Sequence, residues 1–149
     1  MSSPSSEPYT VLVVDDSAEL LDAVTFALRT LGGFQVETAA DGAEGLQKAV
    51  ELQPDCMVID VMMPELNGFQ LVRALRGDPA TASIPLVILS ALVQESDHAR
   101  GMYAGADQYL TKPTKPQDLV EAIRRAIALS DEERRRRMRA LAEDGEDER

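Results

Sequence analysis

Three short, almost wholly apolar runs constrain the fold of this chain more than any other feature. They are VLVV at 11–14, CMVI at 56–59 and LVIL at 86–89. Strands that are buried on both faces have this composition, whereas a strand with one solvated face alternates apolar and polar residues. The three runs therefore predict a parallel sheet that is covered by helices on both sides.

Helical patterns separate these runs. After the first run, apolar residues recur at the spacing of one helix face, namely at Leu20, Val24, Ala27, Leu28 and Leu31. In full, we expect strands at 9–14, 34–39, 56–59, 86–89 and 108–110. We expect helices at 17–31, 42–52, 64–76, 94–103 and 117–129, with Pro64 near the start of the third.

This alternation predicts the α/β fold class. We expect a doubly wound, five-stranded parallel sheet with the flavodoxin-like strand order 2-1-3-4-5 and five helices on its two faces. No linker interrupts the alternation, so 9–129 is expected to be one domain.

The two ends of the chain differ from this body. Residues 1–8 are expected to be a disordered tail. Within 130–149, a capping pattern at 130–133 predicts a charged helix to about Ala142, followed by a disordered end. The arginine-rich run at 134–139 is interpreted as a solvated helix face, because acidic residues flank it; a binding site for an acidic partner is the alternative.

Composition limits the possible partners and location. The net charge of −11 gives a surface that repels nucleic acid and anionic membranes, so direct binding to either is not expected. No apolar run approaches the roughly 20 residues that cross a bilayer, and no signal peptide is recognisable at the start. We therefore expect a cytoplasmic protein. Cys56 is the single cysteine, which excludes a disulfide framework.

Polar residues follow four of the five predicted strands at their carboxyl ends. Asp15 and Asp16 come after the first strand, Asp60 after the third, Ser90 after the fourth and Lys112 after the fifth. In an open parallel sheet, ligands bind at this edge, where the strand order reverses. These four strands are predicted neighbours about 4.8 Å apart, so their terminal side chains should converge on one small volume.

Three carboxylates in one small volume cannot all stay ionised without compensating positive charge. Lys112 offsets one charge, and a divalent cation offsets the rest; few oxygen ligands completed by water favour Mg²⁺. Cation and lysine together attract a phosphoryl group, and a carboxylate can be its nucleophilic acceptor. Asp60 is the best candidate for that acceptor because it lies between the acid pair and the residues Ser90 and Lys112.

Each of these residues also has a simpler interpretation. Asp16 could be the N-cap of the following helix, with Glu19 three residues further on. Ser90 alone is typical of a turn, and Lys112 alone is typical of a solvated surface. Their joint occurrence at selected strand ends favours a single site.

The segments that carry these residues closely resemble the receiver domain of two-component response regulators, the CheY-like family. The resemblance covers 9–129. Its motifs are VLVVDDS at 11–17, VIDVMMPELNG at 58–68, VILSA at 87–91 and GADQYLTKP at 105–113, in the family's order. No active-site position departs from the family's pattern.

The resemblance implies a phosphoacceptor site. Asp60 would receive a phosphoryl group from a phosphohistidine on a sensor histidine kinase or phosphotransfer protein. Asp16, Asp60 and the backbone carbonyl of Met62 would bind Mg²⁺, and Asp15 would act mainly through water. Lys112 would pair with the phosphoryl oxygens.

The resemblance also implies a switch. Ser90 would turn toward the phosphoryl group, and Tyr109 would turn inward behind it, which would change the face formed by 94–103, 108–110 and 117–129. That face is also a plausible surface for a homodimer. The Lys112–Pro113 peptide bond would be cis, a state that occurs chiefly before proline. From residues alone, Tyr109 would be an ordinary half-buried strand residue.

Two further expectations concern the chemistry. Met62 and Leu92, two residues after Asp60 and Ser90, are apolar and predict slow loss of the phosphoryl group to water. His98 is the single histidine and is expected to be a solvated helix residue, so the phosphodonor must be another protein.

The function that we expect is that of a stand-alone phosphoacceptor with protein–protein output, not an enzyme beyond its own phosphorylation and dephosphorylation. One alternative is a haloacid-dehalogenase-like phosphohydrolase, which also uses an aspartate nucleophile and Mg²⁺. That family has D-x-D after its first strand, and this chain has DD. A phosphorylation-independent scaffold is the other alternative.

Overall fold

The computed structural model describes residues 8–129 and 131–147. Its strands are β1 (Thr10–Val14), β2 (Gln35–Ala39), β3 (Cys56–Ile59), β4 (Leu86–Ser90) and β5 (Gln108–Thr111). Its helices are α1 (Ala18–Gly32), α2 (Gly42–Leu52), α3 (Gly68–Gly77), α4 (Glu95–Ala104), α5 (Pro116–Ala128) and α6 (Asp131–Asp147). Each strand begins and ends within one residue of its predicted position.

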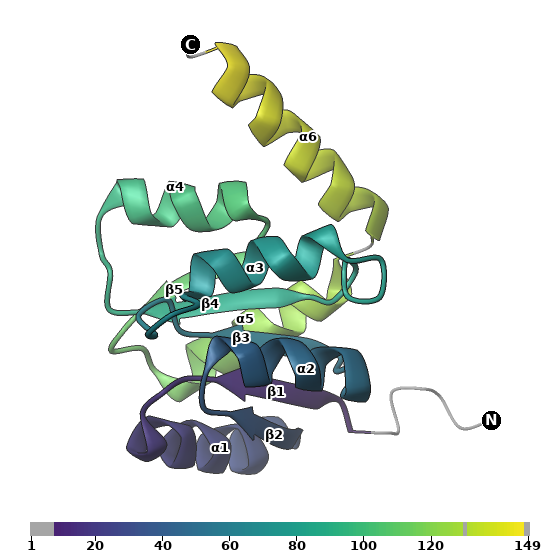
Figure 1. The fold of residues 1–149 in the computed structure, drawn as a ribbon. Coiled ribbons are helices and arrows are strands. Elements are labelled where there is room, and N and C mark those ends of the chain that lie inside the picture. The colour runs from purple at the N-terminus through teal and green to yellow at the C-terminus, as the bar shows by residue number, and fades with distance from the viewer. Residues whose placement is uncertain (1–7, 130, 148–149) are drawn as a thin grey trace, which may run out of the picture.

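The five strands form one parallel sheet in the order β2-β1-β3-β4-β5, which confirms the predicted topology. Val11 pairs with Val36 on one side and with Cys56 on the other, and Val87 pairs with Gln108 at the far edge. Helices cover both faces of this sheet (Figure 1). No helix in the described part of the chain is long and apolar enough to cross a membrane.

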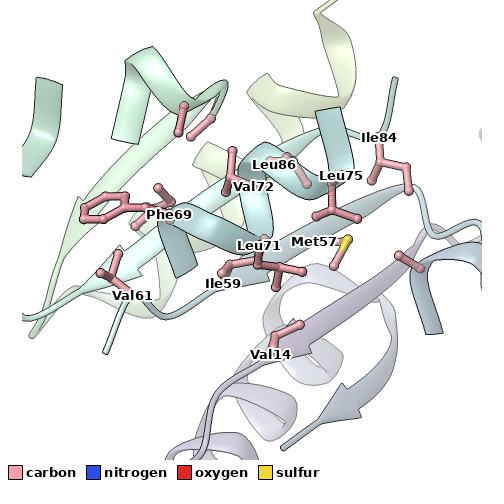
Figure 2. Close-up of a cluster of buried hydrophobic side chains, with 14 of the residues drawn as sticks. Val14, Met57, Ile59, Val61, Phe69, Leu71, Val72, Leu75, Ile84 and Leu86 are labelled. Atoms are coloured by element: carbon pink, nitrogen blue, oxygen red, sulfur yellow. The ribbon is translucent and has the colours of Figure 1, made fainter. Parts of the chain in front are cut away.

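Two apolar cores lie on the two faces of the sheet. Leu12 and Ile59 point to one core, which α2, α3 and α4 cover, and Figure 2 shows its centre around β3 and α3. Val13 and Val58 point to the other core, which α1 and α5 cover. Because successive strand residues point to opposite faces, a strand that serves two cores must be apolar at every position.

Ser17 caps the first helix, so the interpretation of Asp16 as the cap was wrong. The Ser17 hydroxyl accepts the N–H of Leu20 at 3.3 Å, and the backbone of Ser17 is extended, as a cap requires. Asp41 caps α2, because its side chain accepts the N–H of Glu44 at 2.8 Å.

The third helix begins at Gly68, not near Pro64 as predicted. A reciprocal capping box sets its start: Asn67 accepts the N–H of Gln70, and the Gln70 side chain accepts the N–H of Asn67. Pro64 and Glu65, which has a positive φ of 66°, lie in the loop before the helix.

The C-terminal helix α6 is a separate element that follows α5 and runs to Asp147, past the predicted end at about Ala142. Residues 148–149 and the tail predicted at 1–8, apart from Pro8, lie outside the described residues. The interpretation of the arginine run as a solvated face was wrong for Arg134, which is 4% exposed and pairs with Asp107. Arg136 does pair with Glu132 on the surface, at 3.5 Å.

A pair of leucine substitutions tests this account of the core. Leu71 in α3 is fully buried, whereas Leu31 in α1 is 50% exposed. Leu71→Ala should lower the free energy of unfolding by about 2–5 kcal/mol because it leaves a cavity. Leu31→Ala should lower it by about 1 kcal/mol or less. Urea denaturation followed by circular dichroism measures both values, and equal losses would contradict the assignment.

Candidate functional site

The sheet itself holds the predicted site residues in register at its carboxyl edge. The backbone N–H of Asp60 donates to the carbonyl of Val14 at 3.0 Å, and the N–H of Lys112 donates to the carbonyl of Ser90 at 2.8 Å. These bonds extend the strand ladders by one residue beyond β3 and β5. Backbone hydrogen bonds of the sheet therefore fix the positions of Asp60 and Lys112.

Three aspartates and one lysine meet at this edge. Asp15 and Asp60 are buried, at 4% and 6% exposure, and Asp16 is exposed. The Lys112 ammonium nitrogen lies 3.2 Å from Oδ2 of Asp15 and 3.4 Å from Oδ1 of Asp60. One carboxylate oxygen from each aspartate lies within 4.8 Å of the other two. The predicted convergence of Asp15, Asp16, Asp60 and Lys112 is thus present in the structure.

This cluster suits a divalent cation such as Mg²⁺. All three candidate ligands are carboxylate oxygens, and the exposure of Asp16 lets water complete the coordination. Asp15 is fixed by two contacts, since Oδ1 accepts the N–H of Ser17 at 2.9 Å and Oδ2 faces Lys112. Ser17, and not Asp16, caps α1, so the Asp16 carboxylate remains available as a metal ligand.

The environment of Asp60 disfavours its charged form. Burial raises the pKa of the Asp60 carboxyl above its ordinary value, and the neighbouring charge of Asp15 raises it further. Lys112 and the backbone N–H of Met62 act in the opposite direction without cancelling the shift. Additional positive charge at the site would therefore stabilise ionised Asp60.

Ser90 and Tyr109 lie next to the acid cluster. Ser90 is fully buried, and its hydroxyl accepts the N–H of Leu92 at 3.2 Å. Tyr109 already points inward at 9% exposure, and its hydroxyl donates to the carbonyl of Leu92 at 3.0 Å. Burial raises the pKa of the Tyr109 phenol. The ring of exposed His98 lies against the Tyr109 ring in a tilted arrangement, with 5.0 Å between ring centroids and 50° between ring planes.

The peptide bond between Lys112 and Pro113 is cis. Beside it, an apolar groove of about 410 Å³ runs between α1 and the loop from β5 to α5. Its lining includes Leu20 and Val24 of α1, Lys112 and Pro113. The groove thus reaches a residue of the acidic site.

Two glycines with steric roles at the site were not singled out from the sequence. A β-carbon on Gly68 would lie 2.5 Å from the carbonyl oxygen of Asp60, so α3 can start this close to the site only with glycine there. A β-carbon on Gly101 of α4 would lie 2.8 Å from Cδ2 of Tyr109. Gly68 is the last residue of the motif at 58–68, which is a signal for its importance, whereas the role of Gly101 depends on a tertiary contact and has no local signal.

With this geometry in place, the chain can be compared with known proteins. The family model for the response regulator receiver domain matches residues 11–124. The chain belongs to this family, whose members are the receiver domains of two-component regulatory systems.

A relative and two solved structures illustrate the likeness. The DNA-binding dual master transcriptional regulator RpaA of Synechocystis is 38% identical over 121 residues, which are 81% of this chain and 50% of that protein. The chain therefore spans about half the length of the curated relatives that it matches.

The chemotaxis protein CheY4 of Vibrio cholerae has a TM-score of 0.75 at 34% identity, covering 80% of this chain and 99% of that one. The receiver domain of a sensor histidine kinase from Pseudomonas aeruginosa has a TM-score of 0.74 at 27% identity, covering 81% and 98%. That structure contains a magnesium ion coordinated in the active site cleft.

The raised pKa of Asp60 predicts a pH-dependent effect on stability. A raised pKa means that the folded state binds the proton more tightly than the unfolded chain, so stability falls as the pH rises through that pKa. In EDTA at pH 7, Asp60→Asn should therefore raise the melting temperature. The gain should shrink as the pH falls below the raised pKa, toward the ordinary carboxyl value of 3.8.

Exposed Asp22 provides the control, because Asp22→Asn removes a charge far less affected by burial. Calorimetry at several pH values measures these melting temperatures. A lower melting temperature for Asp60→Asn at pH 7, or a gain that does not change with pH, would contradict this electrostatic account.

Proposed function

We propose that this receiver domain accepts a phosphoryl group on Asp60 from the phosphohistidine of a sensor histidine kinase or phosphotransfer protein, in a Mg²⁺-dependent reaction. One observation carries the proposal. Carboxylate oxygens of Asp15, Asp16 and Asp60 lie within 4.8 Å of one another, and the Lys112 ammonium lies 3.2 Å from Asp15 and 3.4 Å from Asp60. The proposal places this reaction in the cytoplasm, as expected for the family.

The chemical step transfers the phosphoryl group from an imidazole nitrogen of the donor to a carboxylate oxygen of Asp60. An oxygen of the Asp60 carboxylate attacks phosphorus, the bond from phosphorus to the donor imidazole nitrogen breaks, and its electron pair stays on that nitrogen. An acyl phosphate forms on Asp60. Phosphoryl transfer depends mainly on positioning and charge neutralisation, and the sheet supplies the positioning because β3 holds Asp60 in register.

The residues around Asp60 have distinct proposed roles. Mg²⁺, when bound by Asp16, Asp60 and the Met62 carbonyl with support from Asp15, offsets negative charge on the carboxylates and on the phosphoryl group. Lys112, which faces both Asp15 and Asp60, would move to a phosphoryl oxygen once Asp60 is modified. Its distance of 3.4 Å from Asp60 supports this role.

Ser90 and Tyr109 are the proposed switch. The Ser90 hydroxyl would turn from the N–H of Leu92 to the phosphoryl group, and the inward position of Tyr109 would be favoured as a result. Because the ring of Tyr109 packs against Gly101, this change would bias the position of α4. The output surface would be the face formed by α4, β5 and α5, which a homodimer would also use.

The proposed phosphodonor is a helical protein that binds the groove between α1 and the loop from β5 to α5. The groove is mostly apolar, and its lining includes Lys112, which pairs with Asp60, so a helix lying in the groove would bring a phosphohistidine toward Asp60. His98, the single histidine of the sequence, lies on α4 and does not line this groove.

Output is proposed to occur by protein contact, without direct binding of nucleic acid by this domain. Its charge of −11 opposes the phosphate backbone of DNA. The relative RpaA is named as DNA-binding, and this chain spans only half of that protein. Its own phosphorylation and dephosphorylation are the only catalytic activities proposed for the domain.

Mass spectrometry after incubation with acetyl phosphate and Mg²⁺ tests the proposal. The wild type should gain one phosphoryl group, which hydroxylamine should remove as expected for an acyl phosphate. Asp60→Asn should gain none, while the control Asp22→Asn on the exposed face of α1 should behave as the wild type. An unmodified wild type, or equal labelling of Asp60→Asn, would overturn the proposal.

The apolar residues Met62 and Leu92 predict a long-lived phosphoryl group, because neither can orient water for attack. Met62 is 58% exposed beside Asp60. After removal of the donor, the label should decay slowly, and Met62→Gln should speed its decay severalfold. Rapid decay of the wild-type label, or no effect of Met62→Gln, would contradict this expectation. Met57→Leu, a buried change away from the site, is the control.

A further inference from the structure

A buried ionic cluster lies at the opposite end of the sheet from Asp60. Asp107 directly precedes β5, and its Oδ2 accepts the N–H of Leu86 at 2.8 Å and a guanidinium N–H of Arg76 at 3.1 Å. Its Oδ1 accepts Nε–H of Arg134, from α6, at 2.8 Å. Arg137 adds a bond to the Asp107 carbonyl at 3.2 Å. This carboxylate thus joins the sheet, α3 and α6.

Arg134 also binds the end of α5. Its guanidinium donates to the carbonyls of Ala126 and Leu129 at 3.3 Å each, and to the carbonyl of Ser83 at 3.2 Å. A buried arginine with bonds to this many groups cannot be displaced without leaving polar groups unsatisfied. The first turn of α6 is therefore anchored to the domain, and Figure 1 shows the rest of the helix extending beyond α3 and α4.

The same cluster reaches the switch elements. Asp107 is the bend residue directly before β5, and Tyr109 is the second residue of that strand. Nε–H of Arg76 donates at 2.9 Å to the carbonyl of Gly105, the C-cap of α4. Tyr109 packs on Gly101 in the same helix. Helix α6 also contacts α4 directly.

We propose that α6 is a brace for the switch face, which holds α4 and inward Tyr109 in their present arrangement through the buried ion pair between Arg134 and Asp107. The family match ends at residue 124, before α6 begins, so the brace is a feature of this chain outside the matched family segment. Its consequence for signalling rests on the proposed function. If phosphorylation favours inward Tyr109, then a brace that favours the same arrangement strengthens binding of a phosphoryl group.

Two variants of the full chain loosen the brace in different ways. Arg134→Met removes the ion pair but keeps an apolar stem in the buried position. Met138→Ala leaves both partners of the pair in place and removes the side chain with which α6 lines a cleft of about 220 Å³ beside Arg76 and Ser83. Exposed Arg139 on the same helix, which does not line this cleft, provides the control, Arg139→Met. Circular dichroism checks that each variant is folded.

Hydrogen exchange without any phosphoryl donor tests the brace itself. Both variants should speed exchange of the α4 amides by about tenfold, while Arg139→Met should leave them unchanged. Faster exchange in α6 with unchanged exchange in α4 would overturn the proposal. Loss of the fold in both variants would also overturn it, because α6 would then be part of the core and not a brace.

Binding of beryllofluoride, a mimic of the phosphoryl group, with Mg²⁺ tests the consequence. Both variants should bind it about threefold or more weakly than the wild type and Arg139→Met do. Unchanged affinity in variants with faster α4 exchange would refute the coupling. A wild type that binds no beryllofluoride would refute the proposed function instead, and the exchange result would still decide whether the brace exists.

Discussion

Electrostatic repulsion among Asp15, Asp16 and Asp60 is the constraint on which the rest of the structure depends. Carboxylate oxygens of the three residues lie within 4.8 Å of one another, and burial of Asp60 adds a desolvation cost to its charged form. The arrangement is held because the acids follow β1 and β3, two central strands that supply apolar residues to both cores. Lys112 offsets part of the charge. The remaining imbalance makes the site attractive to a cation.

Most of the fold could be predicted from the sequence because its main signals are local. Strands such as 56–59 are apolar at every position because both faces are buried, and a run of consecutive apolar residues can be recognised in the sequence alone. The start of α3 could not be predicted in the same way. It depends on the capping box of Asn67 and Gln70 and on the close approach of Gly68 to the backbone of Asp60, which is a tertiary contact.

The site shows the same division. The residues at strand ends could be identified because a parallel sheet brings the carboxyl ends of its strands to one edge, and the family motifs support the choice. The inward packing of Tyr109 against Gly101 could not be predicted from the sequence, because it depends on where α4 lies. Arg134 was misinterpreted because arginines flanked by acids are typical of a solvated helix. Its partner Asp107 lies 27 residues earlier, and no local pattern links the two.

A structure of the protein with Mg²⁺ and beryllofluoride tests the central claim most directly. The account predicts one metal ion bound by Asp16, Asp60 and the Met62 carbonyl, beryllium joined to Asp60, and Lys112 in contact with fluorine. Beryllofluoride bound away from Asp60, or a metal ion that does not touch the acid cluster, would contradict it.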